Sequence, residues 1–109
     1  MIILTIKNIK EIEKDFHKSI REMCETKRAY YEELFKNYGK DLNLEVVLNK
    51  EGNTYKTSAS LNLKTKKMLI VEEGKDIIKT LTRLFSGLKK AVKHQYEIER
   101  KDYLYKRKR

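Results

Sequence analysis

The side chains best placed to do chemistry in this chain are lysines and arginines in its second half. Between residues 75 and 93 they recur at steps of three or four, which places them on one face of an α-helix. The series is Lys75, Lys79, Arg83, Lys90 and Lys93, with Ser86 among them. No acidic residue falls at these positions. A cationic face of this kind attracts phosphate groups, because each neutralised phosphate releases condensed counterions.

Such a face lowers the stability of its own helix, since like charges four residues apart cost about 0.2–0.5 kcal/mol per pair. Lys79 and Arg83 form one such pair, and Lys89 and Lys93 form another. The outer face predicted for the first half of the chain instead mixes both signs, with Lys14, Lys18, Arg21, Glu25, Arg28, Glu32 and Lys36. The contrast favours a polyanion-binding surface over a merely solvated one. At the rise of an α-helix, residues 75–93 span about 27 Å.

Other basic residues flank this face or lie near it in the predicted fold. The candidate nucleic-acid contacts are Lys56, Lys64, Lys66, Lys67, Lys75, Lys79, Arg83, Lys89, Lys90, Lys93 and Lys101. The end of the chain, residues 103–109, reads YLYKRKR and is predicted to be a frayed basic tail. Its cations could reach phosphates, and Tyr103 and Tyr105 could stack on bases.

Groups that could perform catalysis are sparse. His17 and His94 belong to no cluster with ligand spacing, and Cys24, the single cysteine, cannot build a zinc site. Glu72 and Glu73 are neighbours on a predicted strand, so they point to opposite faces and cannot act as an acid–base pair. The sequence therefore predicts no enzyme activity, no metal or other cofactor, and no small-molecule substrate.

Composition narrows the class of protein further. The chain has 109 residues and a net charge of +10, and that length fits one domain, expected over residues 1–102. Charge is uneven, with a net +1 over residues 1–50 and a net +9 over residues 51–109. One cysteine favours a reducing compartment, and no segment resembles a signal peptide or a membrane span. We expect a soluble, cytoplasmic protein with a polyanionic partner and no membrane partner.

The helices and strands that must position these residues can be predicted from the spacing of the apolar residues, which shows two different periods. Spacings of three and four predict amphipathic helices, and strict alternation predicts half-buried strands. In order, they are a strand over 1–7, a helix over about 10–38, strands over 42–49, 55–64 and 68–73, and a helix over about 77–101. Gly39 follows the first helix, and Asp76 is the predicted N-cap of the second.

This order predicts an α+β fold, β-α-β-β-β-α, in which a four-stranded sheet carries both helices on one face. The first strand, helix and second strand suit a right-handed parallel unit. The last three strands are expected to form an antiparallel meander, because their links are too short for crossovers. The other face of the sheet is predicted to be polar, with Lys56, Ser58, Ser60 and Asn62 on it.

The order of elements, the junction EEGKDII and the basic helix that follows resemble the ribosome hibernation promoting factors, also called ribosome-associated inhibitors or sigma-factor modulation proteins. The resemblance extends from the first strand to about Lys101 and is most specific over residues 54–93. Glu73, Gly74 and Asp76 match the E-G-x-D step of the family, and Lys90 matches a basic helix position. The matching helix core positions are Leu81, Leu84, Leu88 and Val92.

The resemblance implies the β-α-β-β-β-α fold and binding to the small ribosomal subunit and its rRNA. Members of the family occupy the channel of the mRNA and of the A- and P-site tRNAs, block initiation and store idle ribosomes. They perform no covalent chemistry. Longer members carry a further domain that pairs two ribosomes, and this chain resembles the short form.

Two other functions remain open at this point. A double-stranded-RNA binding module would also read RNA shape through basic residues. A regulator that binds an acidic protein would use the same charge without RNA. An enzyme is the least favoured alternative.

Overall fold

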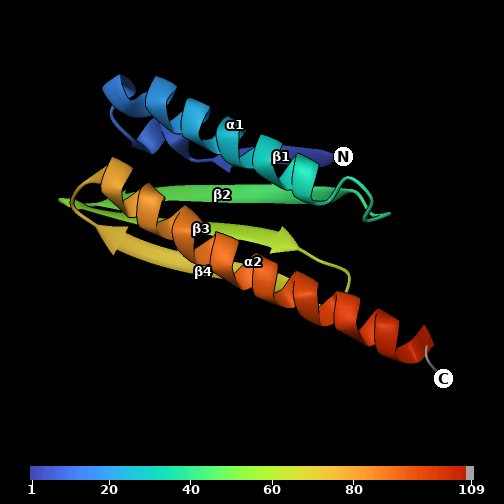
Figure 1. The fold of residues 1–109 in the computed structure, drawn as a ribbon. Coiled ribbons are helices and arrows are strands. Elements are labelled where there is room, and N and C mark those ends of the chain that lie inside the picture. Colours follow the sequence, from blue (N-terminus) through green and yellow to red (C-terminus); the bar gives the residue numbers. More distant parts are fainter. Residues whose placement is uncertain (108–109) are drawn as a thin grey trace.

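Strands and helices follow the order that the two apolar periods predict (Figure 1). The computed structural model describes residues 1–107, and the side chains of residues 1–101. The elements are β1 (Ile2–Lys7), α1 (His17–Leu34), β2 (Leu42–Glu51), β3 (Thr54–Asn62), β4 (Lys67–Gly74) and α2 (Ile77–Arg107). The predicted α+β fold is therefore confirmed.

The four strands form one sheet in the order β1-β2-β3-β4. β1 runs parallel to β2, with Ile2 opposite Leu42, and α1 supplies the crossover between them. β2, β3 and β4 form the antiparallel meander. The turn between β2 and β3 is two residues, Gly52 and Asn53, and Gly52 has a φ of 58°, a left-handed conformation that glycine adopts without steric cost.

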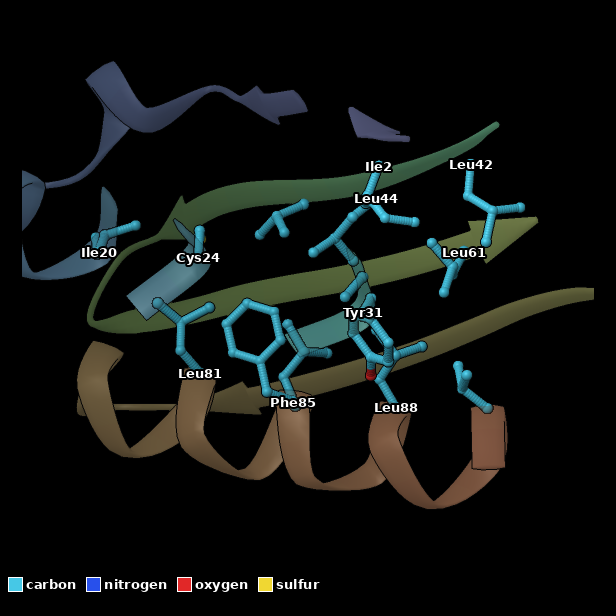
Figure 2. Packing of buried hydrophobic residues seen from close by; sticks show 14 of the residues in the cluster. Ile2, Ile20, Cys24, Tyr31, Leu42, Leu44, Leu61, Leu81, Phe85 and Leu88 are labelled. Atoms are coloured by element: carbon cyan, nitrogen blue, oxygen red, sulfur yellow. The ribbon is translucent and has the colours of Figure 1, made fainter. Parts of the chain in front are cut away.

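Both helices cover the same face of the sheet and close one apolar core (Figures 1 and 2). Alternate residues of β2 point into this core, and so do alternate residues of β3. The fully buried members include Leu44, Val46, Leu48, Ala59 and Leu61 from the sheet, Ile20, Cys24 and Tyr31 from α1, and Leu81, Leu84, Phe85, Leu88 and Val92 from α2. The core is what holds α2 at a fixed angle to the sheet.

The predicted first helix was too long at both ends. Two short 3₁₀ turns, Ile9–Glu11 and Lys14–Phe16, precede α1. The backbone is extended at Ile12, with φ −99° and ψ 147°, so a continuous helix cannot start at residue 10. The Ile12 side chain is nevertheless buried, because this extended link still places it against the core.

The second helix is longer than predicted, since α2 continues to Arg107 rather than ending near Lys101. No glycine or proline follows Gly87 to stop it. Most of the predicted frayed tail is therefore helical, while residues 108–109 lie outside the described part. In Figure 1 the last turns of α2 project beyond the sheet. Within the described residues, neither helix has an apolar stretch that could cross a membrane.

The open face of the sheet is less polar than predicted. Met68 and Ile70 of β4 point toward the helices, so Leu69 and Val71 must point the other way. Their side chains are 55% and 60% exposed. Both faces of β4 carry apolar residues, so alternation along the strand does not indicate which face lies toward the core. The packing of α2 against Met68 and Ile70 determines it.

Candidate nucleic-acid interface

The predicted basic face lies on the side of α2 that points away from the sheet. Lys79, Arg83, Ser86, Lys90 and Lys93 are exposed, and we call this set the α2 ridge. On a helical projection its members fall within about 40° of one line. The opposite side of the same turns is buried in the core, as described above. Lys75 is also exposed but precedes the helix, in the link after β4.

Three features define where α2 begins and hold it, and with it the ridge, against the sheet. At its start, Asp76 Oδ1 accepts hydrogen bonds from the backbone N–H groups of Ile78 and Lys79, at 3.0 and 3.1 Å. This is the N-cap that the sequence predicts. In the middle, Gly87 lies against β4, where an added Cβ would stand 3.3 Å from Ile70 Cγ2.

The third feature ties the second half of α2 to the turn between β3 and β4. Glu99 accepts hydrogen bonds from the hydroxyls of Tyr38 and Thr65. Gln95 Nε2 donates to Thr65 Oγ1 at 2.9 Å. The ring of Tyr96 packs against the rings of Phe35 and Tyr38. These contacts fasten α2 just beyond the last ridge residue, so the ridge lies on a helix segment that is anchored to the fold at both ends.

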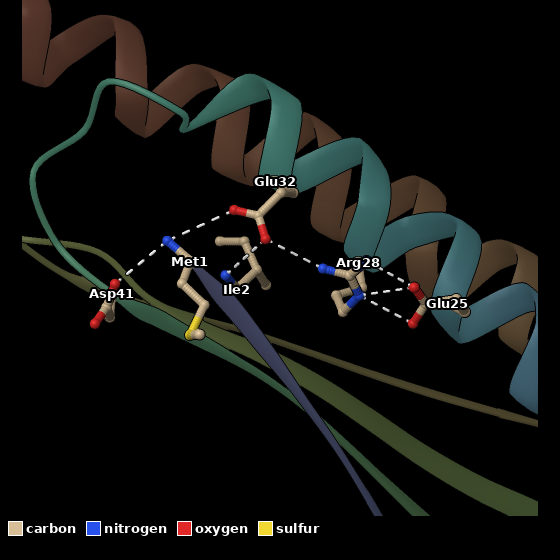
Figure 3. A network of polar contacts seen from close by, with 6 residues as sticks. All are labelled: Met1, Ile2, Glu25, Arg28, Glu32 and Asp41. Atoms are coloured by element: carbon tan, nitrogen blue, oxygen red, sulfur yellow. Dashed lines mark hydrogen bonds and ion pairs between the residues drawn. The ribbon is translucent and has the colours of Figure 1, made fainter.

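Lys75 and the lysines of the α2 ridge are not neutralised by any carboxylate among residues 1–101. Among the described side chains, no ion pair involves Lys75, Lys79, Lys90 or Lys93. On α1, by contrast, Arg28 donates to Glu25 at 2.7 Å and to Glu32 at 3.2 Å (Figure 3). The two helices therefore differ in part. On α1, Arg28 is paired with two carboxylates, while Lys18, Arg21 and Lys27 form no ion pair with a described side chain. On α2, no described carboxylate pairs with the ridge lysines.

Arg83 is the exception on the ridge. Its Nε lies 3.5 Å from Glu72 Oε1, and its Nη2 donates to the Glu73 carbonyl at 3.0 Å. The guanidinium thus reaches back to β4 and is partly neutralised. Its first role is to fasten the start of α2 to the strand before it.

Lys89 and Lys101 are exposed as well but lie beside the line of the ridge or farther along it. The Lys89 ammonium stands 5.0 Å from the ring centroid of Tyr30 on α1, so it lies on the flank that faces α1. Glu97 interrupts the cationic line before Lys101. Arg100, absent from the predicted set, is exposed with its guanidinium 5.8 Å from the Tyr96 ring centroid. Helical spacing places Arg100 on the same flank of α2 as Lys89 and Lys93, and this pattern could have added Arg100 to the predicted contacts.

The structure does not bring the predicted lysines of the sheet onto the ridge. Lys56 and Lys67 alternate with residues that face the core, so they lie on the open face of the sheet. Lys56 Nζ is 3.1 Å from Glu51 Oε2, and this hydrogen bond raises the pKa of Lys56. The sheet therefore separates these two lysines from α2, so they do not extend the α2 ridge, and their contact with RNA stays a prediction.

Lys64 and Lys66 lie in the turn beside the second half of α2, close to Glu99 and Thr65. The Lys64 ammonium stands 4.6 Å from the ring centroid of Tyr38. These two cations adjoin the interface at one end. The side chains of residues 103–109, including the tyrosines proposed to stack on bases, lie outside the described part.

This arrangement can bind a polyanion but cannot by itself read a sequence. Lys79, Lys90 and Lys93 present mobile ammonium groups over about 21 Å of rigid helix. Contacts of this kind to phosphates fix position, while specificity has to come from the shape of the partner.

A scan of the sequence against protein-family models finds no match, and neither does a comparison with curated proteins. The resemblance to the hibernation factors therefore stays a prediction. The case for a function depends on the geometry and the charge of the α2 ridge.

Proposed function

We propose that this protein binds folded RNA through the α2 ridge, and that its target is the rRNA of the small ribosomal subunit. The single observation that carries the proposal is a rigid, exposed helix face whose lysines have no carboxylate partners among the described side chains. A helix that only has to stay solvated gains from ion pairs, as α1 does at Arg28. Leaving the lysines of α2 unpaired lowers the stability of the helix. This cost is useful if the lysines bind an anion of a partner molecule.

The choice of the small subunit is supported by the resemblance in element order, by the E-G-x-D step at Glu73–Asp76 and by Lys90. In this proposal the protein occupies the channel of the mRNA and the tRNAs and keeps idle ribosomes from initiating. It acts in the cytoplasm, by occupancy and without covalent chemistry. Lys75, Lys79, Lys90 and Lys93 contact phosphates, and Lys89, Lys64, Lys66 and Lys101 extend the contact at its flanks.

Co-sedimentation with purified small subunits over a salt series tests the proposal. The test variant changes Lys79, Lys90 and Lys93 to Glu. The matched control changes Lys10, Lys14 and Lys18 to Glu, which are exposed and lie on the α1 side of the molecule. Both variants alter the net charge equally. We expect the ridge variant to lose binding and the control to keep most of it.

The salt dependence of binding makes the same test quantitative. If three phosphate contacts are lost on changing the ridge lysines to Gln, the slope of log affinity against log salt falls by about three. Unchanged sedimentation of the Glu variant would remove the ridge from the interface. Failure of the unmodified protein to sediment with subunits at low salt would remove the ribosome as target.

Two alternatives give different results in the same assay. A double-stranded-RNA module would bind a free duplex as tightly as it binds subunits. A regulator of an acidic protein would bind neither at physiological salt.

A further inference from the structure

The free edge of β1 offers backbone groups that no strand pairs. β1 is the first strand of the order β1-β2-β3-β4, so only β2 lies beside it. The Leu42 N–H donates to the Met1 carbonyl at 3.0 Å. In a parallel ladder alternate residues direct their amide groups to the same neighbour. The backbone N–H and C=O groups of Met1, Ile3 and Thr5 therefore point toward β2. Those of Leu4 and Ile6 point outward, away from the sheet.

The start of this edge is already occupied. The outward N–H of Ile2 donates to Glu32 Oε1 at 3.3 Å, and the same carboxylate lies 3.5 Å from the Met1 amine (Figure 3). No described side chain or strand takes the corresponding groups of Leu4 and Ile6. The open part of the edge thus begins at Leu4. The other edge strand differs, since Arg83 of α2 already donates to the carbonyl of Glu73 in β4.

A hollow lies beside this open part, between β1 and α1. Its volume is about 400 Å³, and its lining includes Leu4 and Ile6 from the strand and Arg21 and Glu25 from the helix. Both apolar side chains are half-buried. The edge therefore combines unpaired backbone groups with an apolar floor, which are the two features that an added strand uses.

The two charged side chains at the hollow differ in whether they are paired, which leaves a net positive charge there. Glu25 is held by Arg28, whose Nη2 donates to it at 2.7 Å, and this contact lowers the pKa of Glu25. Arg21 forms no ion pair with any described side chain. The wall of the hollow thus presents one neutralised carboxylate and one open guanidinium, which favours an occupant that carries a carboxylate.

We infer that the edge of β1 is a strand-addition site for an extended, acidic segment of a partner protein. Alternating N–H and C=O groups at Leu4 and Ile6 match an extended backbone, and neither RNA nor a small ligand repeats that pattern. The partner places an apolar side chain over Leu4 and Ile6 and an acidic side chain, two or four residues away, beside Arg21. The inference does not depend on RNA binding, because the site lies beside α1 and the ridge lies on α2.

Synthetic octapeptides with valine and threonine at alternate positions, acetylated and amidated, provide the probe. In one set an aspartate replaces one valine, and in the other set it replaces one threonine, so both sets carry the same charge. Alternate side chains of a strand point to opposite faces. Only the first set can place the acid on the same face as the valines, toward α1. We expect that set to bind about two- to fivefold more tightly, the effect of an exposed ion pair.

Titration followed by ¹H–¹⁵N NMR locates the site, with shifts expected first at the amides of Leu4, Ile6 and Arg21. Methylating one set of alternate peptide nitrogens should abolish binding, and methylating the other set should leave it intact, because only one set faces β1. The variant Arg21→Glu should reverse the preference toward lysine-bearing peptides. The ridge variant Lys79→Glu should bind the peptides as the unmodified protein does.

Several results would overturn the inference. One is binding of neither peptide set, and another is equal loss on methylating either set of nitrogens. A peptide preference unchanged by Arg21→Glu would remove the acidic partner. Shifts at Leu4 and Ile6 that depend on protein concentration without peptide, together with dimers in analytical ultracentrifugation, would assign the edge to a second copy of this chain instead.

Discussion

At the scale of single residues, position on α2 decides what each cation does. Arg83 contacts the Glu72 carboxylate and the Glu73 carbonyl, so its charge is partly neutralised inside the protein. Lys79 is in the first turn of α2, where the partial positive charge of the helix dipole repels a cation. It is also four residues before Arg83. Both effects make Lys79 unfavourable for folding, and this is the pattern expected of a residue kept for binding.

The variant Lys79→Glu should therefore be more stable and bind RNA less well. We expect a gain of about 0.5–1 kcal/mol in the free energy of unfolding, from the helix dipole and from a new pair with Arg83. Urea unfolding measures the first effect, and sedimentation with small subunits measures the second. A loss of stability together with a loss of binding would show that Lys79 supports the fold.

At the scale of elements, the junction between β4 and α2 aims the ridge. Thr80 is buried, and its hydroxyl donates to the Asp76 carbonyl at 2.7 Å. That hydroxyl and the Arg83 guanidinium close over Gly74. A Cβ on Gly74 would stand 2.3 Å from Thr80 Oγ1 and 2.8 Å from Arg83 Nη2. Arg83 can swing away, but the bonded and β-branched Thr80 cannot.

The variant Gly74→Ala should consequently lose about 1–3 kcal/mol in the free energy of unfolding, as overpacked sites do. The same change made in a Thr80→Ala background should cost clearly less, because the clashing hydroxyl is gone. Urea denaturation of the four proteins completes the cycle. Equal costs in both backgrounds would place the strain elsewhere.

A second element-scale contact joins β1 to α1. The Glu32 carboxylate accepts the Ile2 N–H and lies near the Met1 amine and Arg28 (Figure 3). The hydrogen bond from Ile2 is the main cause that lowers the pKa of Glu32 below its ordinary value. Because the folded pKa is lowered, this contact stabilises the fold fully above the ordinary glutamate pKa and is lost on acidification.

The variant Glu32→Gln should thus be less stable than the unmodified protein at pH 7, with a difference that shrinks as the pH falls below about 4. Urea unfolding at pH 7 and at pH 3 measures both differences. A difference that stays constant across this range would mean that the charge of Glu32 does not matter.

At the scale of the whole molecule, charge and stability have separate sources. Residues 1–50 carry a net +1 and residues 51–109 a net +9, so most of the positive potential follows the second half of the chain. The core that holds the fold is apolar and draws on every strand and both helices. Salt screens exposed charges over about 8 Å at physiological ionic strength and leaves apolar burial largely unaffected.

Raising salt from about 50 to 200 mM should therefore weaken RNA binding by about 100-fold if Lys75, Lys79, Lys90 and Lys93 each contact a phosphate. The midpoint of thermal unfolding should change little over the same range. Sedimentation and circular dichroism measure the two quantities. Binding that resists salt would mean that apolar or neutral contacts dominate the interface.

Sequence patterns by themselves determined the number, kind and order of the elements, the core face of each helix and of β2 and β3, and the line of cations on α2. These properties are periodic and local, because a side chain's direction is set by its own helix or strand. The predicted first helix began too early. Ile12 is apolar and falls at helical spacing, but its backbone is extended rather than helical.

Tertiary structure alone decided which cations keep an open charge, which row of β4 faces solvent and which strand has a free edge. Arg83 is partly neutralised by the carboxylate of Glu72 and the carbonyl of Glu73 in β4, eleven and ten residues earlier in the chain. Arg21 borders a hollow only because β1 has no outer neighbour. Each of these depends on contacts between elements distant in the chain, and no period within one element contains that information.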